Sequence, residues 1–411
     1  MSFNYNVNRN IKINFLLFIL MFLTTGHALN TIAGNKYHFL LIIPILIYFF
    51  CVLYKKINLD IYLLIEFLLL FTWAFALILI LGGSVSYILK FLLVIFFSLV
   101  IVRVYNFEVF RKNFVKAMVI IAVISLVGHV YFVYINPFPP LPIITNVTGI
   151  KYYNALLFFD IVGKAGGRNM GCFWEPGIFG SFLVLAIMFS ILDNNKVQVF
   201  DIIILSVTVF TSQSTAAYLL YILALCLLFV KTIKKITIRK IVLLFILGGI
   251  IACIFMNIND IFNYLLESQP RVFSKLVNET ASSTMRAESP FVNFEIFMEH
   301  PILGVGLDQV GKLYSSANIS QTSTTTYLMA SFGIIGVLVT IFQGAGILFY
   351  KRWNVISRII VFVVFFSIIN KEPHMFFTIT WIISFYFIRD FFSAKQITRK
   401  EGSFEYKNTH C

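Results

Sequence analysis

Long apolar runs recur along almost the whole chain, and they constrain its fold more than any other feature. A helix needs roughly 17 to 25 apolar residues to cross a bilayer, because the hydrocarbon core is about 30 Å thick. About twelve runs approach this length; they lie near 13–29, 38–54, 61–82, 85–102, 117–135, 177–192, 197–211, 214–230, 241–256, 324–350, 357–369 and 374–388. We therefore expect an all-α polytopic membrane protein with about twelve transmembrane helices.

Composition excludes the main alternatives. Of the 411 residues, 59% are hydrophobic and only 12% are charged, whereas soluble globular chains have about 25% charged residues. The net charge of +14 does not indicate nucleic-acid binding, because the basic residues form short clusters between apolar runs. This pattern is typical of a membrane topology signal.

The basic clusters predict how the chain is threaded. With the N-terminus in the cytoplasm, alternation through the runs places 22 of the 32 Lys and Arg residues inside, which favours an even number of helices and two cytoplasmic termini. The predicted divisions are N-terminal helices 1–135, a first outer loop 136–176, central helices 177–256, a second outer loop 257–323, C-terminal helices 324–388 and a cytoplasmic tail 389–411.

Cysteine usage and the first apolar run add two expectations. The five cysteines contain no CxxC pair, and only Cys172 falls in a candidate loop away from the chain end, so neither a disulfide framework nor a metal site is expected. The run 13–29 resembles a signal peptide, but further apolar runs follow along the rest of the chain. We interpret it as a retained first helix.

The first outer loop ends in GGRNMGCFWEPGIFG, which contains Arg168 and Glu175. Pro176 occupies a position suited to the first turn of a helix, so Glu175 should lie near a helix N-terminus, where the macrodipole favours a carboxylate. Arg168 offers a planar guanidinium suited to phosphate. An interfacial arginine and a helix-capping glutamate explain the same residues equally well.

The second outer loop carries Arg271, Lys275 and Arg286, then FEIFMEHPILGVGLDQV with His300. Arginine binds oxyanions in a bidentate manner, which would suit a lipid-linked phosphate, although loop arginines are more often solvated. His300 is a candidate base or phosphate donor, but a histidine before a proline is more often a helix-end residue. The Gly-Val-Gly that follows should bring the backbone close to another segment; without a complete GxGxxG it does not indicate a dinucleotide site.

Two further features lie among the apolar runs. TSQST at 211–215 should form an outer hairpin, in which Gln213 and the hydroxyls either bind sugar or cap the next helix. Glu66 and Lys90 are ionisable residues inside apolar runs; snorkelling or a structural pair explains them at least as well as an ion pathway.

The order of these motifs resembles the O-antigen polymerase and O-antigen ligase superfamily. GRNMGCFWEPGIFGSFL is similar to its Arg-x-x-G-x-F-x-x-P segment, and TSQSTAAYLLY to its Thr/Ser hairpin. MRAESPFVNFEIFMEHPILGVGLDQV is similar to its Arg-containing helix that ends in His-Pro-x-x-Gly-x-Gly, and YLMASFGIIG to its re-entry helix. The resemblance covers about 167–336. Ligases usually have a His-Asn pair where this chain has Thr322 and Ser323, which favours a polymerase.

The resemblance implies a metal-independent glycosyltransferase without a cofactor in a bacterial inner membrane. An acceptor sugar hydroxyl of one lipid-linked repeat unit would attack the anomeric carbon of a growing chain at the outer face, and undecaprenyl pyrophosphate would leave. The implied catalytic residues are Arg168, Glu175, Arg286 and His300, and the implied substrate-binding residues are Arg271, Lys275, Tyr152, Trp174 and Gln213. The implied partners are the lipid-linked repeat units, a chain-length regulator and a flippase.

Two alternatives remain open. A ligase would use the same scaffold to join the glycan to lipid A core. A flippase or other transporter would be expected to have short loops on both faces and charged residues along a central cavity, and the 67-residue stretch 257–323 argues against it.

Overall fold

The computed structural model describes residues 15–31, 79–136, 139–146, 149–163, 167–192, 198–232, 281–316 and 321–392, with a few single positions between 43 and 76. Side chains of 281–286 and of several residues in the first helix lie outside this description. The predicted runs 38–54 and 61–82 fall largely outside the described residues, and 241–256 falls wholly outside them, as does Glu66.

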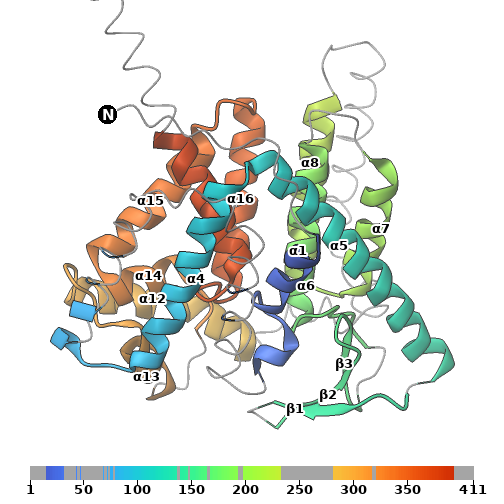
Figure 1. Ribbon diagram of the computed structural model, residues 1–411, viewed down its shortest axis with the longest axis horizontal. Helices are drawn as coiled ribbons and strands as arrows, with labels where there is room; N and C mark the ends of the chain where they lie inside the picture. Colours follow the sequence, from blue (N-terminus) through green and yellow to red (C-terminus); the bar gives the residue numbers. More distant parts are fainter. Residues whose placement is uncertain are drawn as a thin grey trace, which may run out of the picture.

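The described chain is mostly helical (Figure 1). The helices are α1 (Phe15–Leu23), η1 (Ala28–Thr31), α4 (Val85–Val104), α5 (Phe107–Val130), η2 (Tyr131–Ile135), α6 (Pro176–Ile191), α7 (Val199–Thr211), α8 (Thr215–Thr232), α12 (Ala281–Glu299), α13 (Leu307–Ser316), α14 (Thr324–Phe332), α15 (Ile334–Leu348) and α16 (Val355–Lys371). A last helix covers 378–392. Within the described ranges, two helices are long and apolar enough to cross a bilayer, Val85–Val104 and Phe107–Ile135. The number of twelve spans therefore stays a prediction.

The all-α expectation needs one correction, in the first predicted outer loop. Three short strands, β1 (Ile143–Thr145), β2 (Lys151–Asn154) and β3 (Phe159–Ile161), form an antiparallel sheet in the order β1-β2-β3. Prolines before β1 disfavour helix, and the aromatic and β-branched residues of the strands favour extended backbone. One face of the sheet packs Tyr152 and Phe159 against Met170 and Ala28.

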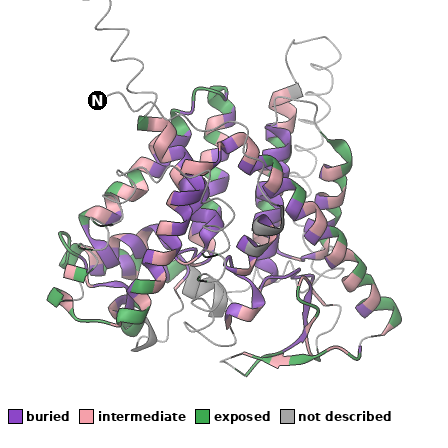
Figure 2. Ribbon diagram, viewed as in Figure 1, coloured by how far each residue is buried: buried purple, intermediate pink, exposed green. Residues whose placement is uncertain are grey.

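Helix α6 lies at the centre of the bundle. All 16 of its residues are buried, and α5, α7, α8 and α16 contact it, as the band of buried residues in Figure 2 illustrates. Its sequence is apolar on every side, which is typical of a helix enclosed by others. A change at either end of α6 is therefore transmitted to the packed core of the protein.

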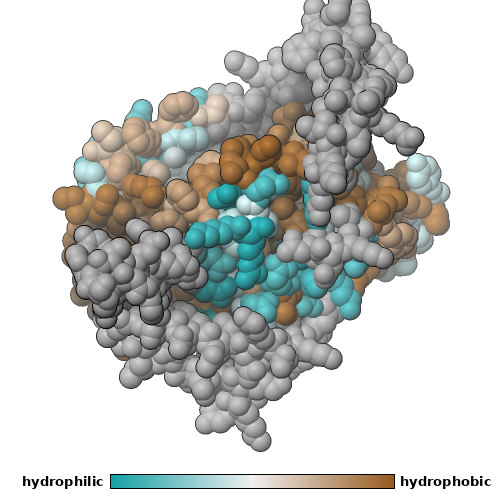
Figure 3. Space-filling view, turned by 90° about the horizontal axis from the view of Figure 1, so that it is seen from above, coloured by the Kyte–Doolittle hydropathy of each residue, from teal (hydrophilic) through white to brown (hydrophobic). Residues whose placement is uncertain are grey.

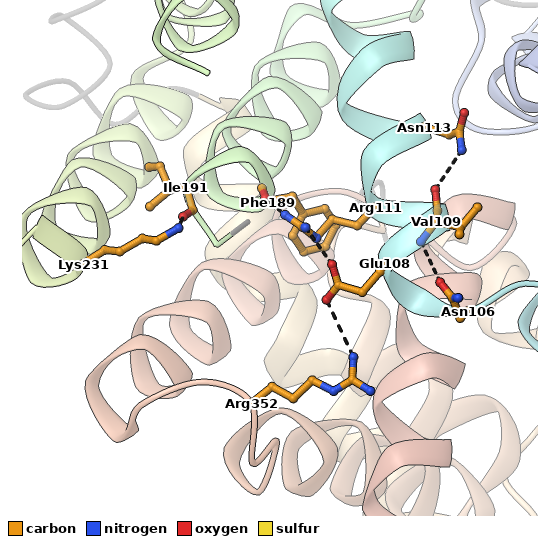
Figure 4. A network of polar contacts seen from close by, with 9 residues as sticks. All are labelled: Asn106, Glu108, Val109, Arg111, Asn113, Phe189, Ile191, Lys231 and Arg352. Atoms are coloured by element: carbon orange, nitrogen blue, oxygen red, sulfur yellow. Dashed lines mark hydrogen bonds and ion pairs between the residues drawn. The ribbon is translucent and has the colours of Figure 1, made fainter. Parts of the chain in front are cut away.

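Two cations hold the C-terminal end of α6 (Figure 4). Arg111 of α5 donates to the carbonyl oxygen of Phe189, and Lys231 of α8 donates to that of Ile191. The Arg111 side chain is only 2% exposed and also pairs with Glu108, with 2.7 Å between nitrogen and oxygen. Carbonyl groups in the last turn of a helix lack intrahelical partners, and cations are favoured there. These two carbonyl groups of α6 thus have hydrogen-bond partners, and the two cations complement the negative end of the helix dipole.

The expected single run 324–350 is in fact a broken helix. Gly333 separates α14 from α15 with φ +57° and ψ −134°, a conformation that L side chains rarely adopt. A Cβ at this position would lie 2.4 Å from the carbonyl oxygen of Ile302. Glycine is therefore required both by the backbone conformation and by the close approach of another segment.

The predicted close approach of the Gly-Val-Gly turn is confirmed at this break. The amides of Val305 and Gly306 donate to the carbonyls of Ala330 and Ser331, and the amide of Ile334 donates to the carbonyl of Ile302. These bonds supply partners for backbone groups that the interrupted helix leaves open. A broken helix at membrane depth is tolerated when protein satisfies its backbone in this way.

Segments with the same predicted sidedness gather at the same end of the bundle. The α4–α5 and α15–α16 connections lie at one end, and the sheet and α13 lie at the other (Figure 1). At the first end Arg352 pairs with Glu108, and Arg389 donates to the Val102 carbonyl. Viewed onto this end, hydrophilic residues gather centrally among hydrophobic ones (Figure 3). Which end faces the cytoplasm stays a prediction.

Candidate functional site

Three segments that are far apart in the sequence meet at the N-terminal end of α6. The amide of Asn169 donates to the Thr211 carbonyl at 2.9 Å, and Nε of Arg168 donates to the Ser212 carbonyl at 3.3 Å. From the end of α16, Lys371 Nζ donates to the Gly177 carbonyl at 2.9 Å and to Ser214 Oγ at 3.3 Å. The α6 start, the α7–α8 hairpin and the end of α16 thus form one polar site.

Glu175 is the N-cap residue of α6, and Pro176 occupies the first helical position as predicted. Its backbone is extended, but its side chain makes no capping hydrogen bond to the helix. The interpretation of Glu175 as a plain helix-capping side chain therefore does not hold. The residue is half-buried and lies beside the positive end of the helix dipole, a position that suits an acidic side chain.

Gly177 allows the carboxylate and the lysine to approach each other. A Cβ built on Gly177 would lie 2.9 Å from Lys371 Nζ and 3.4 Å from Glu175 Oε1. Both charged groups therefore flank the same point on the α6 backbone. Any larger residue at this position would displace the lysine from the helix start.

Lys371 was not identified from the sequence. It lies in the last turn of α16, within the stretch Asn370–His374 (NKEPH) that separates two apolar runs. The signal that was overlooked is a lysine predicted to lie on the outer side, where basic residues are depleted. A cation at the N-terminal end of α6 also opposes the helix dipole, so its position requires a nearby anion such as Glu175.

A fourth segment, at the start of α14, is joined to the site through Asn370. Its Oδ1 accepts hydrogen bonds from Ser323 Oγ at 2.9 Å and from Thr325 Oγ1 at 2.7 Å. Thr324 Oγ1 accepts from the backbone amide of His374 at 2.7 Å. The two positions where ligases usually have His and Asn, Thr322 and Ser323, are both buried here. They lie in the segment bonded to the residue that precedes Lys371.

Helix α12 is bonded to the same segment. Ser289 Oγ donates to Gln321 Oε1 at 2.8 Å, and Asn293 Nδ2 donates to Thr326 Oγ1 at 2.9 Å. Arg286 lies in α12, one turn before Ser289, and its side chain is outside the description. Its predicted contact with substrate therefore stays a prediction, but its helix is tied to the start of α14.

Other predicted site residues are placed as follows. Tyr152 is buried in β2. The pKa of its hydroxyl is raised, chiefly by burial; a hydrogen bond with Asn146 opposes this shift and the charge of Glu175 adds to it. Trp174 packs edge-on against Phe377, with 5.3 Å between ring centroids. Gln213 lies in the α7–α8 turn with φ +46°. Tyr152 and Trp174 thus lie near the Glu175 side of the site.

Of the remaining predicted residues, only His300 lies in the described part of the chain, and no hydrogen bond or ion pair described there joins its side chain to this cluster. His300 is exposed at the end of α12, where its amide bonds to the carbonyls of Ile296 and Phe297; this geometry fits a helix-end role. Arg271 and Lys275 lie outside the described residues. The catalytic role of His300 and the binding roles of these two residues stay predictions.

Part of the chain matches a known protein family. Residues 200–341 match the family model described as O-antigen ligase. No curated protein matches the chain. The matched range spans α7, α8, α12, α13, α14 and half of α15, so it includes the α7–α8 hairpin and the start of α14, whereas Arg168, Glu175 and Lys371 lie outside it.

The match supports the O-antigen ligase and polymerase superfamily, whose members are glycosyltransferase-like enzymes of surface-polysaccharide synthesis. Together with the apolar helices it supports a membrane protein. Two segments of the polar site come from the matched range: the α7–α8 hairpin, which contacts Arg168 and Lys371, and the start of α14, which contacts Asn370.

Proposed function

We propose that the protein polymerises lipid-linked repeat units of a bacterial surface polysaccharide. It transfers a growing glycan from undecaprenyl pyrophosphate to a sugar hydroxyl of the next lipid-linked unit, at the outer face of the inner membrane. The observation that carries the proposal is the convergence of Lys371, Arg168 and Glu175 at the start of α6, against two segments of the matched range.

The two cations fit the charge that develops during such a transfer. The acceptor oxygen forms a bond to the anomeric carbon, the bond from that carbon to the pyrophosphate oxygen breaks, and the leaving group takes the electron pair. Arg168 and Lys371 would stabilise this growing negative charge, because positioned donors act most strongly where charge develops. The guanidinium also suits bidentate binding of an oxyanion.

Glu175 would act on the acceptor side of the reaction. The acceptor hydroxyl loses its proton as the new bond forms, and a carboxylate within hydrogen-bond reach would accept that proton. Trp174 and Tyr152 lie near this carboxylate and would contact sugar faces. Arg286 and, from the second outer loop, Arg271 and Lys275 would add donors for the pyrophosphate, and His300 and Gln213 would contact substrate from α12 and the hairpin.

Ligation to lipid A core is the second candidate, because the matching family model is described as O-antigen ligase. Against it stands the start of α14, where Thr322 and Ser323 occupy the positions of the His-Asn pair usual in ligases. A hydroxyl has no basic lone pair comparable to that of an imidazole. We therefore favour the polymerase.

A surface-polysaccharide gel separates these functions. The gene is deleted and the strain is compared with the same strain complemented in trans. A polymerase predicts lipid A core carrying a single repeat unit in the deletion strain, with the ladder restored by complementation, because export and ligation still work. Bare core would support the ligase or a flippase, and an unchanged ladder would contradict all three.

A further inference from the structure

Helix α12 turns an apolar stripe outward. Phe291, Phe294, Met298 and, just beyond the helix end, Ile302 are 70%, 49%, 61% and 73% exposed. Their spacing of three, four and four residues places them on one helix face. Large hydrophobic side chains scattered singly on a surface need no explanation, but a contiguous apolar stripe marks an interaction surface.

The face of α12 that is turned inward is mixed, because Ile296 is buried in the hydrophobic core and Val292 packs against it. Ser289 and Asn293 are fully buried, and both bond to Gln321 at the start of α14, with Asn293 also bonding to Thr326. A surface helix of a water-soluble domain turns its apolar side chains toward the core and polar side chains outward. Helix α12 also has apolar side chains on its outer side, which indicates that this side faces surroundings less polar than water.

An acidic edge borders the stripe on one side. Glu288, Glu295 and Glu299 are exposed, and their seven- and four-residue spacing places them together along the helix. Unpaired carboxylates are costly in hydrocarbon, so this edge requires water. The helix therefore divides its exposed surface lengthwise into an apolar half and a charged half.

The stripe is continuous with an apolar membrane-type surface. The carbonyl of Ile302 accepts the amide of Ile334, so the end of the stripe lies against the start of α15. From there Ile334, Leu338 and Ile341 are exposed along α15, a 15-residue apolar helix. Exposed apolar side chains thus lie on both sides of the point where the end of the stripe meets the start of α15.

We propose that α12 lies along the membrane–water boundary, with its apolar stripe in the acyl chains of the bilayer and its acidic edge in water. A helix with an apolar face beside a charged one can lie in the interface plane; here the charged edge is acidic. The occupant of the stripe is bilayer lipid. The placement concerns α12 alone, within the stretch predicted to be the second outer loop, and it holds equally for a polymerase or a ligase.

The placement sets the depth of the candidate site. The inner face of α12 is bonded to Gln321 and Thr326, and the start of α14 is bonded to Asn370, which precedes Lys371. A helix fixed at the boundary therefore holds the α14 and α16 ends close to it. The pyrophosphate of a membrane lipid lies at the same depth, at the headgroup level.

Site-specific fluorescence in nanodiscs tests the proposal. The full chain, with its five cysteines replaced, carries one new cysteine labelled with the environment-sensitive dye NBD. Phe294→Cys and Met298→Cys report the stripe, and Glu295→Cys and Glu299→Cys on the same helix are the matched controls. We expect lipid with brominated acyl chains to quench positions 294 and 298, and aqueous iodide to quench positions 295 and 299.

Two outcomes overturn the proposal. Iodide quenching of all four positions would place α12 in water, and protection of 294 and 298 from both quenchers would place another protein surface on the stripe. A second measurement uses the unmodified protein in nanodiscs that contain a lipid with a diazirine on its acyl chain. Photolabelling should fall on the peptide that contains 291–302, and labelling confined to the spanning helices would contradict the placement.

Discussion

The two ends of α6 both receive cations from neighbouring helices, but under opposite electrostatic conditions. At the C-terminal end, Arg111 and Lys231 donate to the Phe189 and Ile191 carbonyls, where the helix dipole favours positive charge. At the N-terminal end, Lys371 donates to the Gly177 carbonyl, where the dipole opposes it. The C-terminal arrangement is favoured by the dipole and by the pairing of Arg111 with Glu108, whereas Lys371 lies against the dipole, with Glu175 beside the same point of the backbone.

Burial sets Arg111 apart from the three charged residues at the other end, whereas Lys231 is half-buried as they are. Arg111 is enclosed and paired with Glu108, so solvent and substrate do not reach it. Half-buried side chains occupy the N-terminal end: Arg168, Glu175 and Lys371. The Glu175 side chain makes no capping hydrogen bond to the helix. Charged groups held in unfavourable positions at an accessible site are typical of functional sites. Buried charges whose partners neutralise them more often stabilise the fold. We infer that the C-terminal end holds α6 in place and the N-terminal end acts on substrate.

The largest effect is expected from Lys371→Met. Loss of a positioned donor for developing charge lowers transfer by roughly 10² to 10³-fold, with little effect on folding because the lysine opposes the helix dipole. Polymer formation by the purified variant measures the loss, and Lys351→Met, an exposed lysine at the other end of the bundle, should behave as wild type.

Cys172 supplies the folding control for Lys371→Met. Its thiol is buried close to the start of α6, and burial raises its pKa to about 12, so it should not react with maleimide in the folded protein. The variant should leave Cys172 unlabelled. Full polymer formation by this variant would remove Lys371 from the proposed site.

Arg111→Met should lower stability and leave activity unchanged. The Phe189 carbonyl would lose a buried, charge-assisted hydrogen bond, which contributes about 1.5 to 3 kcal/mol to stability, while activity per folded molecule is retained. Thermal unfolding in detergent measures the change, with Lys112→Met as the control because Lys112 is the exposed neighbour. A variant as stable as wild type would show that this end of α6 is not the anchor.

A smaller effect is expected from Gly177→Ala. The new Cβ would lie 2.9 Å from Lys371 Nζ, so the flexible lysine must move, and misplacement of a catalytic group by a fraction of an ångström should lower transfer roughly tenfold. Gly311→Ala is the control, because no atom lies within 4 Å of a Cβ there. Equal activity in the two variants would argue that the position of Lys371 is unimportant.

The smallest effect is expected from Ser214→Ala. It removes one neutral acceptor, 3.3 Å from Lys371 Nζ, which should lower transfer by roughly two- to fivefold, in line with a net contribution of about 0.5 to 1 kcal/mol. Ser212→Ala is the matched control, because its hydroxyl donates locally to the Val209 carbonyl. A larger loss at Ser212 than at Ser214 would contradict the assigned geometry.

Sequence patterns predicted the helical class, the helix start at Pro176, and the close approach of the Gly-Val-Gly turn. These features follow from local rules: apolar run length, proline in a first turn, and glycine where backbones meet. The sheet at 143–161 was missed because its strands are three or four residues long and give almost no periodicity. The break at Gly333 was missed because the residues on both sides of it are apolar.

The candidate site was predictable only in part. Arg168 and Glu175 lie close together in the sequence, and both were identified. Lys371 is 194 residues from the carbonyl it contacts, so its place depends on how α16 packs against α6 and α8, which no local pattern specifies. Half-buried hydrogen-bond partners such as Asn370 carry no sequence signal of their own. Long-range packing, rather than residue chemistry, limited the prediction.

The most direct test supplies purified protein in nanodiscs with an undecaprenyl pyrophosphate-linked repeat unit and, in the same reaction, lipid A core. A polymerase whose site lies at the start of α6 predicts lipid-linked chains of two or more repeats in the wild type and none in Lys371→Met, with the core unmodified in both. Glycan attached to the core by the wild type, without longer lipid-linked chains, would contradict the proposed function.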